Sequence, residues 1–283
     1  MTSGQHNIAR QLLATCVAAA ARAGDFIRER ATNRGAIHWE EKAGADFVSD
    51  VDRGAEQAIG DIVVARHADA RILGEELSPA MNDRAGLVFV VDPLDGTTNF
   101  LHGFPWYAVS IAALVDGDVV AGTVLNAATG ELFTATSGGG ARANGQPIRV
   151  SPITDPRRSL VGTGFPFKEG ARVDEYLRML EPIMRGTAGI RRPGAAALDL
   201  ADVACGRFEA FWELMLAPWD IAAGILLVRE AGGVITDLEG RPCPVTHTGV
   251  VAGSPAMHAW LLERVAARHT SALDTPAPPV HNQ

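Results

Sequence analysis

Two aspartates, Asp92 and Asp95, open the part of this sequence whose residue types and spacing most clearly indicate chemistry. They belong to the run DPLDGTTNF at residues 92–100, which follows a continuous apolar stretch. Carboxylates that converge at the end of a strand repel each other unless a cation lies between them, and oxygen ligands, including the Leu94 carbonyl, suit Mg²⁺. Thr97 adds a hydroxyl and, where a helix begins, a backbone N–H group that can hold a phosphate. The run therefore predicts a metal-assisted phosphate site.

Taken singly, the acidic residues of this region have ordinary structural explanations. A bare DxxD pair is more often an aspartate-capped turn whose second aspartate lies in solvent. Glu75, which follows a predicted strand, would be a solvated loop charge, and Asp220, at the start of an apolar helix, would be an N-cap or first-turn acid. The prediction of a metal site therefore depends on the whole of DPLDGTTNF and on the segments that accompany it.

The elements that must position these residues are buried strands and amphipathic helices, mixed along the whole chain. The apolar run 87–91 is typical of a strand buried on both faces, which we expect to end at Asp92, where Pro93 and Gly96 turn the chain. The predicted helices cover 7–32, about 50–69, 171–185, 194–205, 218–231 and 255–268. The predicted strands cover 71–74, 86–92, 106–115, 118–125, 130–135, 147–151, 207–213 and 248–252, and a loop occupies 33–49.

This order of elements predicts an α/β (α+β) fold. The chain has 283 residues, and we expect two halves that share one compact body. An N-terminal α+β half, residues 1–150, would carry the main metal-binding motifs. A C-terminal α/β half, residues 151–270, would complete the active site. Residues 271–283, which are rich in Pro and Ala, would form a flexible tail.

The balance of charge limits the partners that this chain can have. It carries 33 acidic and 25 basic residues, a formal net charge of −8. Nucleic acid and anionic membranes need a basic face, so neither is expected as a direct partner, whereas a small phosphorylated molecule is compatible if metal ions supply positive charge. The three cysteines lie far apart and no apolar run reaches membrane-spanning length, so a reducing cytoplasm is the expected location.

Several segments together resemble the inositol monophosphatase family, the Mg²⁺-dependent, lithium-sensitive phosphatases. The resemblance extends from about Ile8 to Leu262, and the DPxDGTxNF and WDxAAG elements, in this order, are highly specific for it. The resembling segments are Lys42, DFVSDVD at 46–52, GEE at 74–76, DPLDGTTNF at 92–100, GAA at 194–196, Glu213 and WDIAAG at 219–224. TGFPF at 163–167 and LLVREAGG at 226–233 are most similar to the bacterial inositol-1-monophosphatases.

The resemblance implies a site for two Mg²⁺ ions. Glu75, Asp92 and the Leu94 carbonyl would hold one ion. Asp92 would be shared with the second ion, which Asp95 and Asp220 would also bind.

The resemblance also implies which residues act on the nucleophile. Thr97, hydrogen-bonded near Asp52 and Glu75, would orient the attacking water and help to deprotonate it, so these three are the implied catalytic residues. Lys42 would lie on a mobile loop near a weaker third metal ion.

A substrate pocket with two ends follows from the same resemblance. The backbone N–H groups of Gly96 and Thr97 would bind the phosphate. Glu213 and Asp95 would accept hydrogen bonds from ring hydroxyls of the alcohol. The implied substrate-binding residues are Asp95, Gly96, Thr97, Gly194, Ala195, Ala196, Glu213 and Asp220. Ala195 is a departure, because many relatives have Thr or Ser there, so one polar contact with the substrate is missing.

These features predict a homodimeric enzyme that hydrolyses inositol monophosphate, in the layered α/β/α/β/α sandwich of the inositol monophosphatase and fructose-1,6-bisphosphatase type. Because phosphatases of this fold share the metal site, histidinol phosphate, fructose 1,6-bisphosphate and 3′-phosphoadenosine 5′-phosphate are alternative substrates. A regulatory binding role alongside catalysis is a further alternative, since some bacterial relatives associate with the transcription machinery. The complete set of acidic residues argues against such a role alone.

Overall fold

The computed structural model describes residues 3–43, 46–80, 84–167 and 170–269, and the side chains of residues 42–46 are not among the described ones. The tail predicted at 271–283 lies outside the described residues and stays a prediction. The helices are α1 (Ser3–Ala31), α2 (Asp50–Arg66), α3 (Thr97–His102), α4 (Val173–Gly186), α5 (Ala196–Ala204), α6 (Pro218–Glu230) and α7 (Pro255–Ala266), with the short 3-10 turns η1 (Arg34–Ala36), η2 (Pro156–Arg158) and η3 (Gly170–Arg172).

Two large sheets and one hairpin contain the described strands. The first sheet holds, in spatial order, β3 (Arg71–Gly74), β4 (Leu87–Asp95), β5 (Ala108–Val115), β6 (Asp118–Asn126), β7 (Leu132–Thr136), β8 (Gly140–Ala143) and β9 (Gln146–Pro147). The second sheet holds, in spatial order, β11 (Gly189–Arg191), β10 (Leu160–Thr163), β12 (Ala210–Leu216), β14 (Thr248–Gly253) and β13 (Val234–Thr236). The hairpin pairs β1 (Trp39–Ala43) with β2 (Asp46–Ser49).

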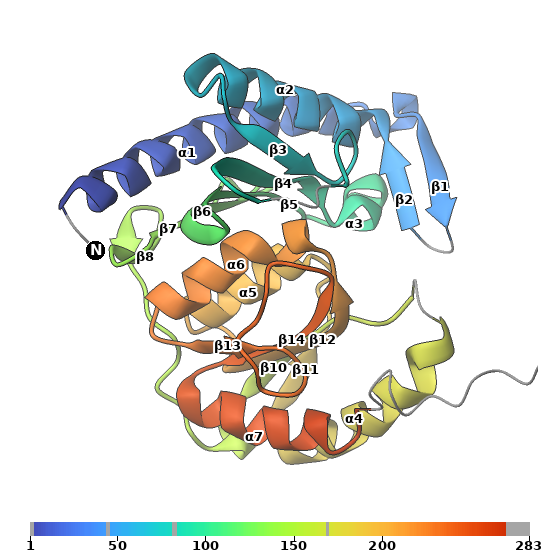
Figure 1. The fold of residues 1–283 in the computed structure, drawn as a ribbon. Coiled ribbons are helices and arrows are strands. Elements are labelled where there is room, and N and C mark those ends of the chain that lie inside the picture. Colours follow the sequence, from blue (N-terminus) through green and yellow to red (C-terminus); the bar gives the residue numbers. More distant parts are fainter. Residues whose placement is uncertain (1–2, 44–45, 81–83, 168–169, 270–283) are drawn as a thin grey trace, which may run out of the picture.

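Helices and sheets alternate in five layers (Figure 1). Helices α1 and α2 pack on one face of the first sheet, and α5 and α6 fill the space between the two sheets. Helices α4 and α7 cover the remaining face of the second sheet. The predicted α/β/α/β/α sandwich is therefore confirmed.

Strand β4 shows why a continuous apolar run is needed at the centre of the first sheet. Val88 and Val90 pack with α5 and α6, whereas Phe89 and Val91 pack with α1 and α2. All four side chains are buried. Successive side chains of a strand point to opposite faces, so a strand covered on both sides has no solvent-facing position before it reaches Asp92.

A β-bulge in β4 gives the two aspartates a common face. Asp92 pairs with Ser110 and Asp95 pairs with Ala108 of β5, so three steps along β4 match two steps along its neighbour. Residues three apart in a regular strand point to opposite faces, and the one extra residue reverses this. The bulge includes residues 93–94, where proline has no N–H to offer the ladder. The sequence predicts an end of this strand at Asp92, whereas the strand continues through the bulge to Asp95.

A second bulge lies in β12. Trp212 and Leu214 face α4 and α7, whereas Phe211 faces α5 and α6. Between Glu213 and Leu216 the register with β14 shifts by one residue, and Leu216 then packs on the α5 and α6 side. The shift occurs where β12 reaches the cavity described below.

Several short elements differ from the sequence prediction. The loop predicted at 33–49 contains η1 and the β1–β2 hairpin, across which Trp39 and Phe47 pack edge to face with ring centroids 5.3 Å apart. The sequence prediction omits β8, β10, β11 and β13, which have three or four residues each and carry little periodic signal. The strand predicted at 147–151 is wrong, since β9 covers only 146–147.

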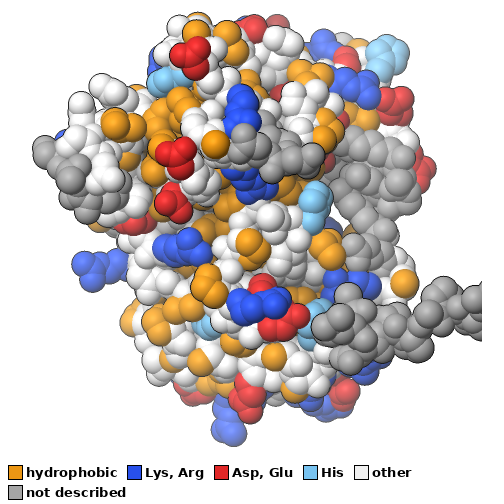
Figure 2. Space-filling view, in the orientation of Figure 1, with side chains coloured by type: hydrophobic (Ala, Val, Ile, Leu, Met, Phe, Trp, Pro, Cys, Tyr) orange, Lys and Arg blue, Asp and Glu red, His pale blue; other side chains and the backbone are white. Residues whose placement is uncertain are grey.

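The described surface and helices give two further observations. On the face shown in Figure 2, acidic and basic side chains of the described residues are interspersed among apolar ones. None of the described helices combines the length and the apolar character that crossing a membrane requires.

Candidate active site

A cavity of about 660 Å³ lies where the ends of β4 and β12 meet the first residues of α3, α5 and α6. The sequence-predicted residues that line it are Glu75, Asp92, Leu94, Asp95, Gly96, Thr97, Gly194, Ala195, Ala196, Glu213 and Asp220. Asp52 is buried and contacts Thr97 without lining the cavity. The side chain of Lys42 lies outside the described residues, and its backbone belongs to strand β1 rather than to a loop.

Backbone N–H groups fix the direction of three carboxylates in this cavity. Asp92 Oδ1 accepts a hydrogen bond from the N–H of Leu94 at 3.0 Å. Asp95 Oδ2 accepts from the N–H of Ala197 at 2.7 Å, in the first turn of α5. Asp220 Oδ2 accepts from the N–H of Ala217 at 2.7 Å, at the start of α6. Two helix starts and one bulge therefore orient the acidic groups.

The acidic groups make one another harder to ionise. Burial raises the pKa of Asp92 well above its usual range, and the charges of Glu75, Asp95 and Asp220 raise it further. Burial also raises the pKa of Asp95 to about 8, with the charge of Asp220 as the next cause. Like charges that share a poorly hydrated space favour protonation unless a cation neutralises them. The cavity is therefore electrostatically suited to a cation.

Glu75 lies in a turn whose backbone is hydrogen-bonded to the buried side chain of Glu56. Glu56 on α2 accepts hydrogen bonds from the N–H groups of Glu76 at 2.7 Å and Leu77 at 3.0 Å. A Cβ added to Gly74 would lie 2.0 Å from the Glu56 carboxylate, so glycine is needed for this close approach. The two residues after Glu75 are thus hydrogen-bonded to α2, and the residue before it packs closely against the same carboxylate.

Thr97 begins α3 and contacts Asp52 on α2. Its Oγ1 lies 2.8 Å from Asp52 Oδ1 and 3.0 Å from the carbonyl oxygen of Leu94. Burial raises the pKa of Asp52, although hydrogen bonds from Ser49 and Thr97 partly oppose that effect. The Thr97–Asp52 contact that the family resemblance implies is present in the structure.

The chain around Gly96 is packed against the loop that carries Gly194. Gly96 has a φ of +88°, and an added Cβ would lie 3.0 Å from the Trp106 carbonyl oxygen and 3.3 Å from that of Gly194. Asn99 donates from Nδ2 to the carbonyl oxygens of Trp106 at 2.7 Å and Pro193 at 2.9 Å. The Asn99 amide therefore joins α3, whose first residues the resemblance assigns to the phosphate, to the loop that carries Gly194.

Two acidic side chains stand at the other end of the cavity. Glu213 ends the regular part of β12 and lies against Gly164, where an added Cβ would be 2.0 Å from the carboxyl carbon of Glu213. Asp199 on α5 is buried, and its Oδ1 has no hydrogen-bond partner in the described part of the chain. Burial raises the pKa of Asp199 well above its usual range, and the charge of Glu213 raises it further.

The rim of the cavity combines aromatic rings with a basic side chain. The guanidinium carbon of Arg192 lies 5.4 Å from the ring centroid of Phe165 and 5.1 Å from that of Phe167. Met215 and His247 also line the cavity. The opening of the cavity is therefore apolar and cationic, whereas its interior is lined by carboxylates.

The donor set fits a divalent metal ion. Carboxylate and carbonyl oxygens are the ligands that Mg²⁺ prefers, and six carboxylate side chains line this cavity, of which Glu75, Asp92, Asp95 and Asp220 lie with Leu94 at one end. Among the described residues, no group of three or more His, Cys, Asp or Glu side chains is gathered closely enough to form a ready-made metal cage. The fit rests on the chemistry of the donors and on their mutual electrostatic effect.

Comparison with known proteins agrees with the fold. Residues 9–270 match the model of the inositol monophosphatase family. The chain belongs to the inositol monophosphatase family.

Relatives within the family carry two kinds of name. The chain is 42% identical over 255 residues to a putative Nus factor SuhB of Neisseria meningitidis, covering 90% of this chain and 98% of the relative. It is 45% identical over 213 residues to an inositol-1-monophosphatase of Rhizobium meliloti, covering 75% of this chain and 80% of the relative. The crystal structure of the extragenic suppressor protein suhB from Bartonella henselae matches with a TM-score of 0.85 and 39% identity, over 90% of this chain and 98% of that one.

The structure adds residues that the sequence prediction omits. Glu56 follows Asp52 by four residues and so shares its face of the helix, which was an available signal. Asn99 lies inside DPLDGTTNF, and the motif alone does not indicate its hydrogen bonds to the Trp106 and Pro193 carbonyls. Asp199 is one of two buried acids, with Asp202, in helix α5, whose other residues are apolar. Arg192 gives no local signal, because its contacts with the phenylalanines depend on tertiary packing.

Proposed function

We propose that the chain hydrolyses inositol monophosphate to inositol and phosphate, with Mg²⁺ and with water as the nucleophile. The observation that carries this proposal is the bulge of β4, which brings Asp92 and Asp95 into one cavity with Glu75 and Asp220. Membership of the inositol monophosphatase family supports it. Compact acidic sites of this kind suit an anionic substrate only when metal ions offset the charge.

The proposed metal ligands are those expected from the sequence. Glu75, Asp92 and the Leu94 carbonyl would hold one Mg²⁺, and Asp95 and Asp220 would join Asp92 around a second. A weaker third ion would bind near Lys42. Two bound divalent ions lower the pKa of a water nucleophile and stabilise the charge that develops on the leaving oxygen.

Thr97 is proposed to orient the attacking water. A hydroxyl has one hydrogen, and Thr97 Oγ1 can donate it to Asp52 Oδ1, which leaves lone pairs on Oγ1 to accept a hydrogen from water. The Leu94 carbonyl is a second acceptor within reach at 3.0 Å. If that carbonyl serves as a metal ligand, Asp52 becomes the favoured acceptor and fixes the orientation of the hydroxyl.

The two ends of the substrate would be read by different residues. Gly96 and Thr97 would offer backbone N–H groups to the phosphate. Glu213 and Asp95 would accept hydrogen bonds from ring hydroxyls, beside the wall formed by residues 194–196. The structure supports this division, because Glu213 lines the same cavity from a different sheet.

A substrate panel tests the proposal. Phosphate release is measured with the purified chain and Mg²⁺ on inositol 1-phosphate, histidinol phosphate, fructose 1,6-bisphosphate and 3′-phosphoadenosine 5′-phosphate. We expect the highest kcat/KM on inositol 1-phosphate. A higher value on another member of the panel would reassign the substrate, while loss of release in chelator would still support metal-assisted hydrolysis.

A second role alongside catalysis is proposed because several relatives are named Nus factor SuhB. In this proposal the chain also acts as a regulatory binding protein. Affinity capture from an extract of the source cells, followed by identification of the bound proteins, tests it. Recovery of transcription proteins with the wild-type chain and with a catalytically inactive variant would support a separate binding role, and their absence from both would oppose it.

A further inference from the structure

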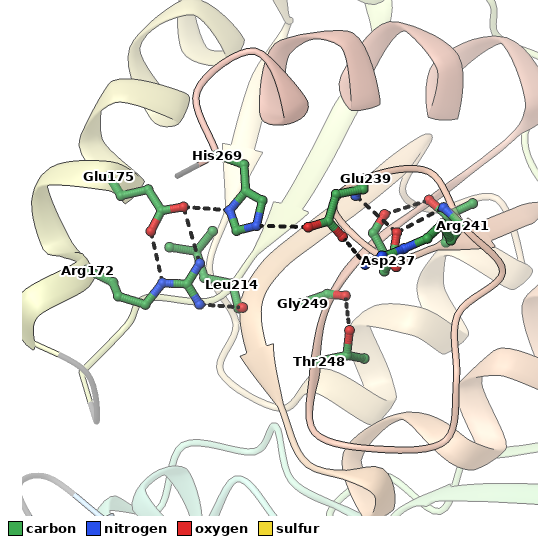
Figure 3. A network of polar contacts seen from close by, with 10 residues as sticks. Arg172, Glu175, Leu214, Asp237, Glu239, Arg241, Thr248, Gly249 and His269 are labelled. Carbon is green, nitrogen blue, oxygen red and sulfur yellow. Dashed lines mark hydrogen bonds and ion pairs between the residues drawn. The ribbon is translucent and has the colours of Figure 1, made fainter. Parts of the chain in front are cut away.

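Arg172, at the start of α4, donates a hydrogen bond to the backbone of β12, the strand that forms one wall of the cavity. Figure 3 shows Arg172 between the carboxylate of Glu175 and the backbone carbonyl of Leu214. Arg172 Nε and Nη2 donate to the two oxygens of Glu175 at 2.9 and 3.2 Å, and Nη1 donates to the Leu214 carbonyl at 2.9 Å. The guanidinium therefore joins α4 to a strand 42 residues further along the chain.

The Leu214 carbonyl accepts this hydrogen bond within the bulge of β12. Glu213 pairs with Val250 and Leu216 pairs with Thr248, so one residue of β12 is extra. A bulge interrupts the ladder, and the backbone groups inside it must find other partners. Arg172 supplies a charged donor to such a group, which gives a stronger hydrogen bond than a neutral donor would.

Arg172 is itself fixed in direction. Its side chain is 19% exposed and that of Glu175 is 9% exposed. Glu175 Oε1 also contacts His269 Nδ1 at 2.7 Å, and His269 Nε2 lies 3.4 Å from Glu239 Oε1 (Figure 3). The carboxylate that binds Arg172 is thus anchored to the segment after α7. A guanidinium bound through two of its nitrogens presents the third in a defined direction.

The neighbours of Leu214 in β12 line the cavity. Its own side chain packs in the core between the second sheet and α4 and α7, and Leu214 lies in the cavity lining together with its neighbours Glu213 and Met215. The start of α4 makes a second contact with this wall, because the Tyr176 ring stacks on that of Trp212 with centroids 5.9 Å apart. A displacement of the Leu214 carbonyl would therefore move the two cavity-lining residues beside it.

We propose that Arg172 is a positioning residue that holds the β12 bulge, and with it Glu213 and Met215, in the wall that receives the alcohol part of the substrate. Arg172 does not touch the substrate and acts through the Leu214 carbonyl. The identity of the substrate in this inference rests on the proposed function. The placement of the bulge rests only on the hydrogen bond from Arg172 to the Leu214 carbonyl. The positioning role predicts an effect on recognition of the alcohol that leaves the metal end of the cavity unchanged.

The kinetic test compares the full-length wild-type chain with R172Q, R172K and R185Q at saturating Mg²⁺. Arg185 is the matched control, since it lies on the helix that Arg172 precedes and also pairs with a glutamate, Glu181 at 3.0 Å, but on the exposed surface. For R172Q we expect KM for inositol 1-phosphate to rise about fivefold or more, as for loss of a hydrogen bond to a charged group, with kcat within about twofold. R172K, which keeps the charge but not the fork of donors, should lie between wild type and R172Q.

A compact ester separates positioning from general damage. 2-Glycerophosphate places less alcohol against β12, so its KM in R172Q should stay within about twofold of wild type, and R185Q should match wild type on both esters. An unchanged KM for inositol 1-phosphate in R172Q would overturn the proposal. So would an equal loss on both esters, because it would indicate damage to the fold or to the metal end.

Hydrogen exchange of the substrate-free chains tests the placement of the bulge independently of any substrate. In R172Q, amides of residues 213–217 should exchange faster than in wild type, whereas those of 87–95 in β4 should not change. Equal exchange at 213–217 would overturn the positioning role. If wild type releases no phosphate from inositol 1-phosphate, the proposed function fails, and the exchange comparison still decides whether Arg172 holds the bulge.

Discussion

Thr97 Oγ1 lies 2.8 Å from Asp52 Oδ1, although the two residues are 45 positions apart in the chain. The carboxylate is fixed by the start of its own helix, because Asp52 Oδ2 accepts the backbone N–H of Ser49 at 2.8 Å in a capping box. The sequence predicts that this helix begins at about residue 50, and Ser49 is its N-cap. The residue that stabilises the first turn of α2 thus also provides the hydrogen-bond acceptor for Thr97.

Replacement of Thr97 tests the proposed handling of the attacking water. Thr97→Ser keeps the hydroxyl and should reduce kcat only mildly, whereas Thr97→Val has nearly the same shape without a hydroxyl and should reduce kcat about 100-fold or more. The measurement is kcat on inositol 1-phosphate, with Mg²⁺ affinity from calorimetry as the control, which should be similar in both variants. Equal activity of the two variants would remove Thr97 from the mechanism.

Glu56 is expected to affect metal binding by Glu75, because it fixes the backbone N–H groups of Glu76 and Leu77 in the same turn. In Glu56→Gln one carboxylate oxygen becomes an NH₂ group facing a backbone N–H, so one buried donor at Glu76 or Leu77 loses its acceptor. Such a loss costs about 1–3 kcal/mol of unfolding free energy and should loosen the Glu75 turn. We expect a lower midpoint in urea and a several-fold higher Mg²⁺ requirement for activity. Glu181→Gln, an exposed control on α4, should change neither, and a normal Mg²⁺ requirement in Glu56→Gln would refute the link.

The stability of the metal-free protein should fall as the pH rises. Burial raises the pKa of Asp95 from an ordinary 3.8 to about 8 and raises that of Asp92 as well, so the folded state binds more protons than the unfolded state above about pH 4. The stabilisation is complete below about pH 4 and is lost progressively as the pH rises toward 8. The melting temperature in chelator should therefore decrease from about pH 5 to about pH 8, and saturating Mg²⁺ should remove or reverse that decrease, because metal ions bind the ionised groups. A melting temperature in chelator that increases over this range would contradict the electrostatic account.

Glu213 should discriminate between alcohols. A hydrogen bond to a charged group contributes about 1.5–3 kcal/mol, so Glu213→Gln should lower kcat/KM for inositol 1-phosphate about tenfold or more. The loss on 2-glycerophosphate should be clearly smaller, and the Mg²⁺ dependence should be unchanged for both esters. An equal loss on both would place Glu213 in the metal site or in fold stability, and no loss would make it a strand-end charge without a role in recognition.

The parts of the fold that could be predicted from the sequence are those with a long local signal. The apolar run before Asp92 identifies β4 because burial on both faces demands it. The amphipathic periodicity identifies α1, and an uninterrupted apolar run after Asp220 identifies α6. The bulge in β4 has no comparable signal, since it depends on pairing with β5. The division of the chain near residue 150 stays a prediction, although the first sheet ends at Pro147 and the second begins at Leu160.

The candidate site was predictable where motif residues act directly and not where other residues support them. Asp92, Asp95 and Thr97 stand in one specific run. In contrast, the hydrogen bonds of Glu56 to the Glu75 turn and of Arg172 to the Leu214 carbonyl join segments that only tertiary packing brings together. A solvated charge and a positioning charge look the same in a sequence, because the difference lies in burial and in the partner.

The most direct test of the metal-assisted account is phosphate release from inositol 1-phosphate by wild type and Asp92→Asn, each with Mg²⁺ and with excess chelator. Asp92 is proposed to contact both ions, so the Asn variant should lose most activity while it remains folded by circular dichroism, and wild type should be inactive in chelator. Hydrolysis by wild type in excess chelator, or near wild-type activity of Asp92→Asn, would contradict the claim that these carboxylates hold the metal ions that activate water.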